Sequence, residues 1–316
     1  MKRFCIQIIK TGLFFLTAVL LTLIISSFPG CNTLLGRLTN SMSYVQVNTG
    51  PSEILPFIEK ARTPDSATKL IVGDSVCRQL FNGLEKYNPE ICICGTNAAI
   101  STCGQYVLIS EYLRTHQNVT DVFLIMSPGS LASELNTEWS YPYAVMPFAE
   151  SGTLHLMHQK TLQQMRQRFG SLFLKDSIVN LIDRSPMNRK LYLNLQQQLD
   201  RTQGEPLFSM ADLYIPLLYD MCKNSGIAFH LLPTPQAAID NENTPSTMET
   251  AYYTTKTSQL FPDFYSQICT YPKEMFHDGV HFSGEYAQQE ELNKRITEMY
   301  LKTGLISELR LDSYEH

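Results

Sequence analysis

Two short stretches near opposite ends of the chain carry side chains that could together perform nucleophilic catalysis. The first ends in Ser75, which follows the apolar run Leu70–Val72 through a Gly-Asp pair, and the second contains Asp278 and His281. A serine nucleophile needs a histidine base, and that base needs a carboxylate to fix its tautomer and orientation. Asp278 and His281 share a short glycine-containing loop, so they can meet without help from distant segments.

Each stretch also has a purely structural interpretation. Serine is a common residue at a helix N-cap, so Ser75 could simply begin the helix predicted to follow it. Likewise, Ser283 could cap a helix predicted over 285–301, with His281 exposed in a polar loop. The two stretches together favour the catalytic interpretation, because they supply all the side chains that a serine nucleophile requires.

The elements that must position these residues alternate between strands and helices. Apolar, β-favouring runs predict strands at 69–72, 90–94, 121–126 and 227–232. One helix is predicted over Val76–Leu84, a second from after Ser101 to about His116, and a third over Ala211–Asn224. Buried strands that alternate with helices indicate a parallel sheet covered on both faces. Ser75 then lies at the carboxyl edge of the sheet and at a helix N-terminus, where free N–H groups favour negative charge.

On these motifs the chain resembles the SGNH/GDSL hydrolase superfamily, whose first block is Gly-Asp-Ser and whose last is Asp-x-x-His. The resemblance covers about 69–301. It implies an α/β, three-layer flavodoxin-like sandwich with a parallel central sheet and, in this chain, a long insertion after the third strand. It also implies that Ser75 is the nucleophile, His281 the base and Asp278 the orienting acid. No cofactor is expected.

The oxyanion donors depart from the superfamily pattern. The superfamily takes them from the serine N–H, from a glycine after the second strand and from an asparagine after the third. Here Ala99 occupies the glycine position, and Ser127-Pro-Gly-Ser130 stands where the asparagine is expected. Ala99 and Asn97 are therefore the candidate oxyanion residues, with Ser130 as a further possibility for the third donor. The departure resembles the membrane-anchored branch that handles acyl groups in the cell envelope.

Composition and the N-terminus set the compartment. With a net charge of −5 and no marked cluster of basic residues, the chain gives no support to nucleic-acid binding. Lys2, Arg3 and Lys10 precede the uncharged apolar run Thr11–Phe28. This arrangement predicts an uncleaved signal anchor with the domain outside the cytoplasm. A lipoprotein at Cys31 and a cleaved signal peptide are the alternatives, and both also export the domain.

The expected organisation is an anchor over 1–30, a tether over 31–64 with one short helix around 52–62, a domain over 65–305 and a tail over 306–316. The insertion spans about 131–206 and begins with an aromatic, proline-punctuated loop at 139–148. Helical stretches are predicted within it at 160–173 and 188–201. A segment of this length between core strands is typical of a cap or a substrate-binding insertion.

The eight cysteines do not predict a metal site. Cys92 and Cys94 alternate with isoleucines on a predicted strand and should point to one face. No second cysteine pair or histidine stands at a suitable spacing, so no metal is expected. Export permits disulfides, whose pairing the spacing leaves open.

The sequence thus predicts an extracytoplasmic serine esterase or O-acyltransferase. The resemblance and the anchor favour O-acyl groups of an envelope polysaccharide as substrate and a membrane acyltransferase as partner. The alternatives are a non-catalytic carbohydrate-binding or assembly subunit that keeps the fold, and a lipid-directed esterase.

Overall fold

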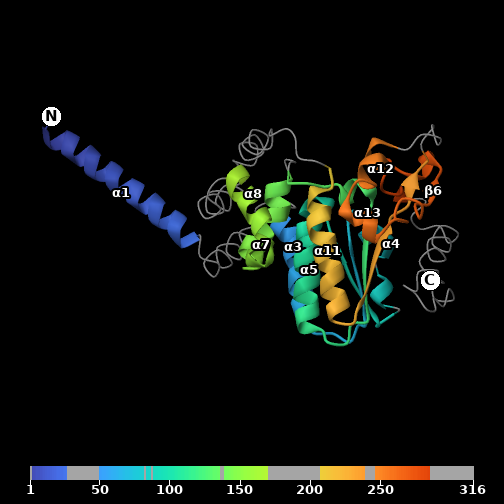
Figure 1. Ribbon diagram of the computed structural model, residues 1–316. Helices are drawn as coiled ribbons and strands as arrows, with labels where there is room; N and C mark the ends of the chain where they lie inside the picture. Colours follow the sequence, from blue (N-terminus) through green and yellow to red (C-terminus); the bar gives the residue numbers. More distant parts are fainter. Residues whose placement is uncertain are drawn as a thin grey trace. The chain divides into compact units, whose positions relative to one another are not determined.

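The structure is a computed structural model (Figure 1). It describes residues 2–26, 50–81, 83–86, 88–135, 139–169, 207–238 and 246–284. The chain divides into two compact units, Met1–Ser52 with Asn136–Thr202, and Glu53–Leu135 with Gln203–His316. The second unit contains both candidate catalytic stretches.

A four-stranded sheet forms the centre of this second unit. Its strands are β1 (Lys69–Gly73), β2 (Ile91–Gly95), β3 (Asp121–Met126) and β4 (Ala228–Pro233). All three pairings are parallel, and the strand order is β2-β1-β3-β4. The predicted α/β class with a parallel sheet is confirmed. Because β1 lies between β2 and β3, the residue that follows it sits between two neighbouring strand ends.

Side chains that alternate along the strands supply two hydrophobic clusters, one on each face of the sheet. Leu70 and Val72 belong to the cluster that includes side chains of α5 (Ser101–Thr115) and α11 (Ser209–Asn224), which Figure 1 shows lying together. Ile71 belongs to the other cluster, with side chains of α4 (Ser75–Phe81) and of the segment near His281. Helices and sheet therefore form layers, as predicted. The helix expected over 285–301 lies outside the described residues.

Helix α3 (Gly50–Arg62) falls in the segment that the sequence assigned to a tether. Its side chains Ile54, Ile58 and Ala61 are fully buried, and Ala61 packs in the cluster with Leu70. An apolar stripe at this spacing belongs to a helix that covers a core. The residues from Glu53 onward therefore belong to the compact unit that contains the sheet.

The described residues of the second unit also form shorter elements. They are the helices α6 (Pro128–Leu131), α12 (Thr247–Tyr252) and α13 (Lys256–Leu260), the 3₁₀ turns at Leu84–Lys86, Ala98–Ile100 and Lys273–Met275, and the parallel strand pair β5 (Gln236–Ala237) and β6 (Thr270–Tyr271).

In the first unit, the aromatic segment predicted as a loop is helical. It forms a short π-helix at Tyr141–Val145, followed directly by α7 (Met146–Glu150). Pro142 and Pro147 had suggested a loop, but each lies in the first turn of its helix. Proline is tolerated there because the N–H it lacks would have no partner within the helix. A 3₁₀ turn at Leu154–Leu156 and α8 (Gln159–Phe169) follow, and the stretch predicted at 188–201 lies outside the described residues.

The N-terminal segment is a continuous helix, α1 (Lys2–Ser26). Its large apolar side chains are exposed, among them Phe14 and Phe15. Over the residues that the structure describes, no helix reaches the length and hydropathy needed to cross a membrane. The signal anchor stays a prediction of the sequence.

Candidate active site

Ser75 is the first residue of α4, directly after the turn that leaves β1. Gly73 is required in this turn, because a Cβ there would lie 2.0 Å from the carbonyl oxygen of Ile125. The fully buried Asp74 occupies the capping position: its Oδ1 accepts the N–H groups of Val76 and Cys77, both at 3.0 Å. Asp74 thus does the capping that serine could have done, and the hydroxyl of Ser75 is available for other contacts.

Asp74 also connects the turn before Ser75 to the end of the neighbouring strand β3. Its Oδ2 accepts the N–H of Ser127, the residue after β3, at 2.8 Å. One carboxylate therefore fixes both the start of α4 and the end of β3. The position of Ser75 is set by two strands of the sheet rather than by one loop.

The structure brings the three predicted catalytic side chains into one chain of hydrogen bonds. Nε2 of His281 lies 2.7 Å from the Oγ of Ser75, and Nδ1 of His281 lies 2.7 Å from Oδ2 of Asp278. The first distance is short enough for a proton to pass between Ser75 and His281, and the second lets the carboxylate orient the imidazole. The contact with the carboxylate assigns the proton of the neutral imidazole to Nδ1, which leaves the lone pair of Nε2 facing Ser75.

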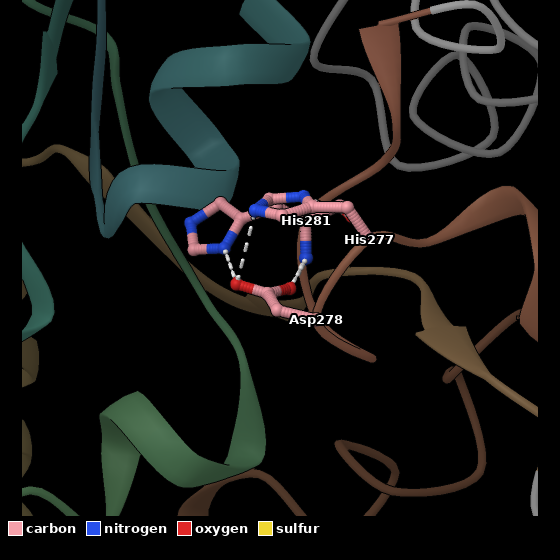
Figure 2. Close-up of side chains that lie close together, drawn as sticks. All are labelled: His277, Asp278 and His281. Atoms are coloured by element: carbon pink, nitrogen blue, oxygen red, sulfur yellow. Dashed lines mark hydrogen bonds and ion pairs between the residues drawn. The ribbon is translucent and has the colours of Figure 1, made fainter.

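The loop that carries Asp278 and His281 is shaped by its own backbone. Oδ1 of Asp278 accepts the N–H of Val280 at 3.0 Å and that of His281 at 2.7 Å. Gly279, which lies between Asp278 and Val280, has a φ of 82°, a left-handed conformation that glycine adopts without strain. Figure 2 shows the resulting arrangement, in which the carboxylate lies close to the imidazoles of His277 and His281. The short spacing seen in the sequence is therefore sufficient to build the acid–base pair.

These bonds also set the ionisation of Asp278. Partial burial works to raise the pKa of Asp278, but the N–H of His281, its imidazole and the N–H of Val280 all favour the carboxylate. Together they lower the pKa of Asp278 from 3.8 to about 2. The carboxylate is therefore charged at any pH near neutrality and can stabilise a protonated His281.

Sequence reasoning missed Gln79, which lies one turn after Ser75 on α4. Its Nε2 donates to the carbonyl of Phe282 at 2.8 Å, and its Oε1 accepts the N–H of Phe282 at 3.1 Å. This pair of bonds attaches the residue after His281 to the helix that carries Ser75. The spacing of Ser75 and Gln79 places both on one helix face, and that was the only signal in the sequence.

The predicted oxyanion residues lie together after β2, but they bond to each other. The N–H of Ala99 donates to Oδ1 of the half-buried Asn97 at 2.9 Å. The alanine N–H expected to take the glycine's role is therefore occupied. The same bond fixes the amide of Asn97 and leaves its Nδ2 as the donor not used in that bond.

The other candidate donor after β3 is turned inward. The hydroxyl of Ser130 lies 2.8 Å from that of Ser127, and the N–H of Ser130 donates to the same Ser127 oxygen at 3.1 Å. Both serines are buried. Of the donors considered, the N–H of Ser75 at the start of α4 and Nδ2 of Asn97 are the ones that none of these bonds uses.

The chain matches no protein-family model and no curated protein. It has a distant structural likeness, at a TM-score of 0.36 and 13% identity, to a protein from Streptococcus pneumonia provisionally named a platelet activating factor. The likeness covers 81% of this chain and 94% of that protein. It carries no argument about activity.

Over the part of the chain that the structure describes, no group of possible metal ligands includes a cysteine. Cys92 and Cys94 are buried in one hydrophobic cluster, on the same face, as their alternation predicts. Among the described residues, the ligand-type side chains that gather are His277, Asp278 and His281, whose ligand atoms all lie within 4.8 Å of one another. His277 was not singled out from the sequence. Its position depends on how the loop turns back on itself.

Proposed function

We propose that this chain is a serine acyl-ester enzyme that uses Ser75, His281 and Asp278. The observation that carries the proposal is the continuous hydrogen-bonded series from Asp278 through His281 to Ser75, with both contacts at 2.7 Å. A serine that only caps a helix would have no need of an imidazole at hydrogen-bond distance. A histidine that only fills space would have no need of a carboxylate on its far nitrogen.

The reaction follows from the tautomer of His281. As the Oγ of Ser75 attacks an ester carbonyl, its proton passes to Nε2 of His281, and Asp278 stabilises the imidazolium that forms. Collapse of the tetrahedral intermediate breaks the bond to the alkoxide leaving group, which takes that proton. The acyl group then resides on Ser75. Water or a glycan hydroxyl attacks it by the same steps in reverse, so hydrolysis and transfer share every residue.

The developing oxyanion needs donors that are in place before the reaction. We assign this role to the N–H of Ser75 and to Nδ2 of Asn97, because the N–H of Ala99 already donates to Asn97. Each donor of this kind contributes roughly a hundredfold or more to the rate. A site with two donors in place of three is expected to be slow rather than inert.

For the substrate, we propose O-acyl groups of a cell-envelope polysaccharide, with the domain outside the cytoplasm. The support is the basic residues before the apolar run Thr11–Phe28, together with the resemblance of the motifs to envelope acyl-transfer proteins. In this proposal α1 attaches the protein to the membrane. The partner protein in this proposal is a membrane acyltransferase, which would supply or receive the acyl group.

The test is covalent labelling of the full chain with a fluorophosphonate, alongside hydrolysis of a nitrophenyl acetate. Wild-type protein should be labelled on Ser75, and Ser75→Ala should lose the label and about 10⁶-fold in kcat. Ser246→Ala is the matched control, since Ser246 is an exposed serine at the start of α12, and its labelling should equal that of the wild type. Wild-type protein that takes no label and turns over no ester would favour the non-catalytic binding subunit.

A further inference from the structure

His277 adjoins the candidate triad without taking part in it. Its side chain is 62% exposed, and its Nε2 lies 3.6 Å from Oδ2 of Asp278. Its Nδ1 lies 3.2 Å from the backbone carbonyl of His281, and its own N–H donates to that carbonyl at 3.0 Å. The ring is thus held over the carboxylate by the same loop that forms the acid–base pair (Figure 2).

The contact with the carbonyl determines which nitrogen of His277 carries the proton. A carbonyl oxygen only accepts, so Nδ1 is the protonated nitrogen and Nε2 presents its lone pair. That lone pair faces a carboxylate oxygen, which also carries only lone pairs. Two such atoms repel each other while the imidazole is neutral, and either a proton on Nε2 or a metal ion bound by both atoms would make the contact favourable. A histidine whose far nitrogen is fixed by a carbonyl is also the usual arrangement of a metal ligand.

His281 supplies a third donor to the same place. One ligand atom from each of His277, Asp278 and His281 lies within 4.8 Å of the other two. Nδ1 of His281 lies 2.7 Å from the same Oδ2 of Asp278 that Nε2 of His277 approaches. In a tetrahedral zinc site with bonds near 2.1 Å, donor atoms are separated by about 3.4 Å, so only small movements of the three side chains are needed. Two imidazoles and one carboxylate also form a common zinc ligand set, with the fourth position left to water.

We propose that His277, Asp278 and His281 bind a zinc ion that inhibits the enzyme. The inhibitory part rests on the proposed function. When zinc takes the lone pair of Nδ1 on His281, the imidazole must carry its proton on Nε2. Nε2 then donates to the Oγ of Ser75 and has no lone pair to accept the serine proton. The metal also occupies the Asp278 oxygen that would stabilise the imidazolium.

The ligand set predicts which ions bind. Imidazole nitrogen suits zinc and its transition-metal neighbours, whereas magnesium prefers oxygen ligands in octahedral geometry. Magnesium should therefore neither bind here nor compete with zinc. This difference separates a built site from the general attraction of an acidic protein for divalent cations.

The binding test is a competition titration of the untagged full chain with a chromophoric zinc indicator. Wild-type protein should bind one zinc per chain at this site, and His277→Ala should weaken that binding by at least about 100-fold. His155→Ala is the matched control, because His155 is also exposed and its Nδ1 lies 2.8 Å from the carbonyl of Gly152. It should bind zinc as the wild type does. Equal zinc affinity in His277→Ala and wild type, or no binding by either, would overturn the site.

The inhibition test is fluorophosphonate labelling with and without saturating zinc, each variant being compared with itself. In wild type, zinc should suppress labelling of Ser75 and a chelator should restore it. In His277→Ala, the same zinc concentration should change the labelling little. If Ser75 takes no label even without zinc, the proposed function fails, and the titration still decides the metal site. If wild type binds zinc through His277 but is labelled at an unchanged rate, the inhibitory role is wrong.

Discussion

On one side of Ser75, Asp278 and His281 are held by hydrogen bonds within a single short loop, and Gln79 attaches that loop to the nucleophile helix. On the other side, the segment around Asn97 and Ala99 satisfies its own polar groups and offers fewer free donors. We call these the acid–base side and the oxyanion side. The acid–base side is complete before any substrate binds. On the oxyanion side, the N–H of Ala99 already donates to Asn97 within the turn.

The contrast indicates which half of the proposed chemistry could tolerate an exchange of donors. Activating the serine depends on side-chain identities that have no substitute, so each must be present and aligned. Stabilising an oxyanion depends on any well-placed N–H, so a turn can exchange one donor for another. The chain can therefore lose one oxyanion donor and keep the nucleophile, at a cost in rate.

The largest effect beyond Ser75 should come from the acid–base side. Asp278→Asn should lower kcat by about 10⁴-fold, because an amide can donate to Nδ1 of His281 and hold the imidazole in the wrong tautomer. Asp263→Asn, at an exposed aspartate outside the loop, is the control and should leave kcat unchanged. Near-normal turnover of nitrophenyl acetate by Asp278→Asn would show that Asp278 does not orient His281 for catalysis.

The oxyanion side should respond less. Asn97→Ala should lower kcat by about a hundredfold with little change in KM, since the donor acts chiefly in the transition state. Asn88→Ala is a matched control, because the Asn88 side chain also accepts an N–H two residues later, at 3.1 Å from Glu90. An unchanged or raised kcat in Asn97→Ala would mean that the released N–H of Ala99 is the true donor.

Gln79 tests the attachment between the loop and the helix. Gln79→Ala should lower kcat about tenfold with KM unchanged, because Phe282 and with it His281 would be less firmly positioned against Ser75. Arg78→Ala is the control, because Arg78 lies beside Gln79 on α4. This change removes the ion pair of Arg78 with Glu53 of α3 but leaves both hydrogen bonds between Gln79 and Phe282 in place. A loss of thermal stability without a change in kcat would give Gln79 a purely structural role.

The smallest effect is on stability. The pKa of Asp278 is about 2 in the folded protein, below its ordinary 3.8, so its ionised form stabilises the fold above that ordinary value. This contribution should disappear as the pH falls from about 5 to about 2. The difference in urea midpoint between wild type and Asp278→Asn should therefore shrink over that window. A difference that stays constant down to the acid end would contradict the lowered pKa.

Much of the fold could be predicted because its signals are local. The strands are short runs of buried apolar residues, and β3 has the predicted bounds, Asp121–Met126. The candidate triad could be predicted from residue types and from the proximity of Asp278 and His281 in sequence. Helix α3 lies where the sequence predicts a short helix around Ser52–Arg62, and its buried face of Ile54, Ile58 and Ala61 packs in the unit that contains the sheet.

The remaining features depend on contacts that a sequence does not display. Gln79 matters only because Phe282 docks beside it, and Ala99 loses its donor only because Asn97 turns back to accept it. His277 lies at the carboxylate because its ring bonds to a carbonyl four residues ahead. The loop predicted at 139–148 was wrong because helices tolerate proline in the first turn, where Pro142 and Pro147 lie.

The hydrogen bond between Ser75 and His281 joins residues 206 positions apart. A ribosome delivers the chain from its N-terminus, so the nucleophile and its strand exist well before the base is made. A chain cut short anywhere in that interval carries an ordinary serine hydroxyl with nothing to take its proton. Under the proposed function, reactivity toward esters therefore requires synthesis of the chain through His281.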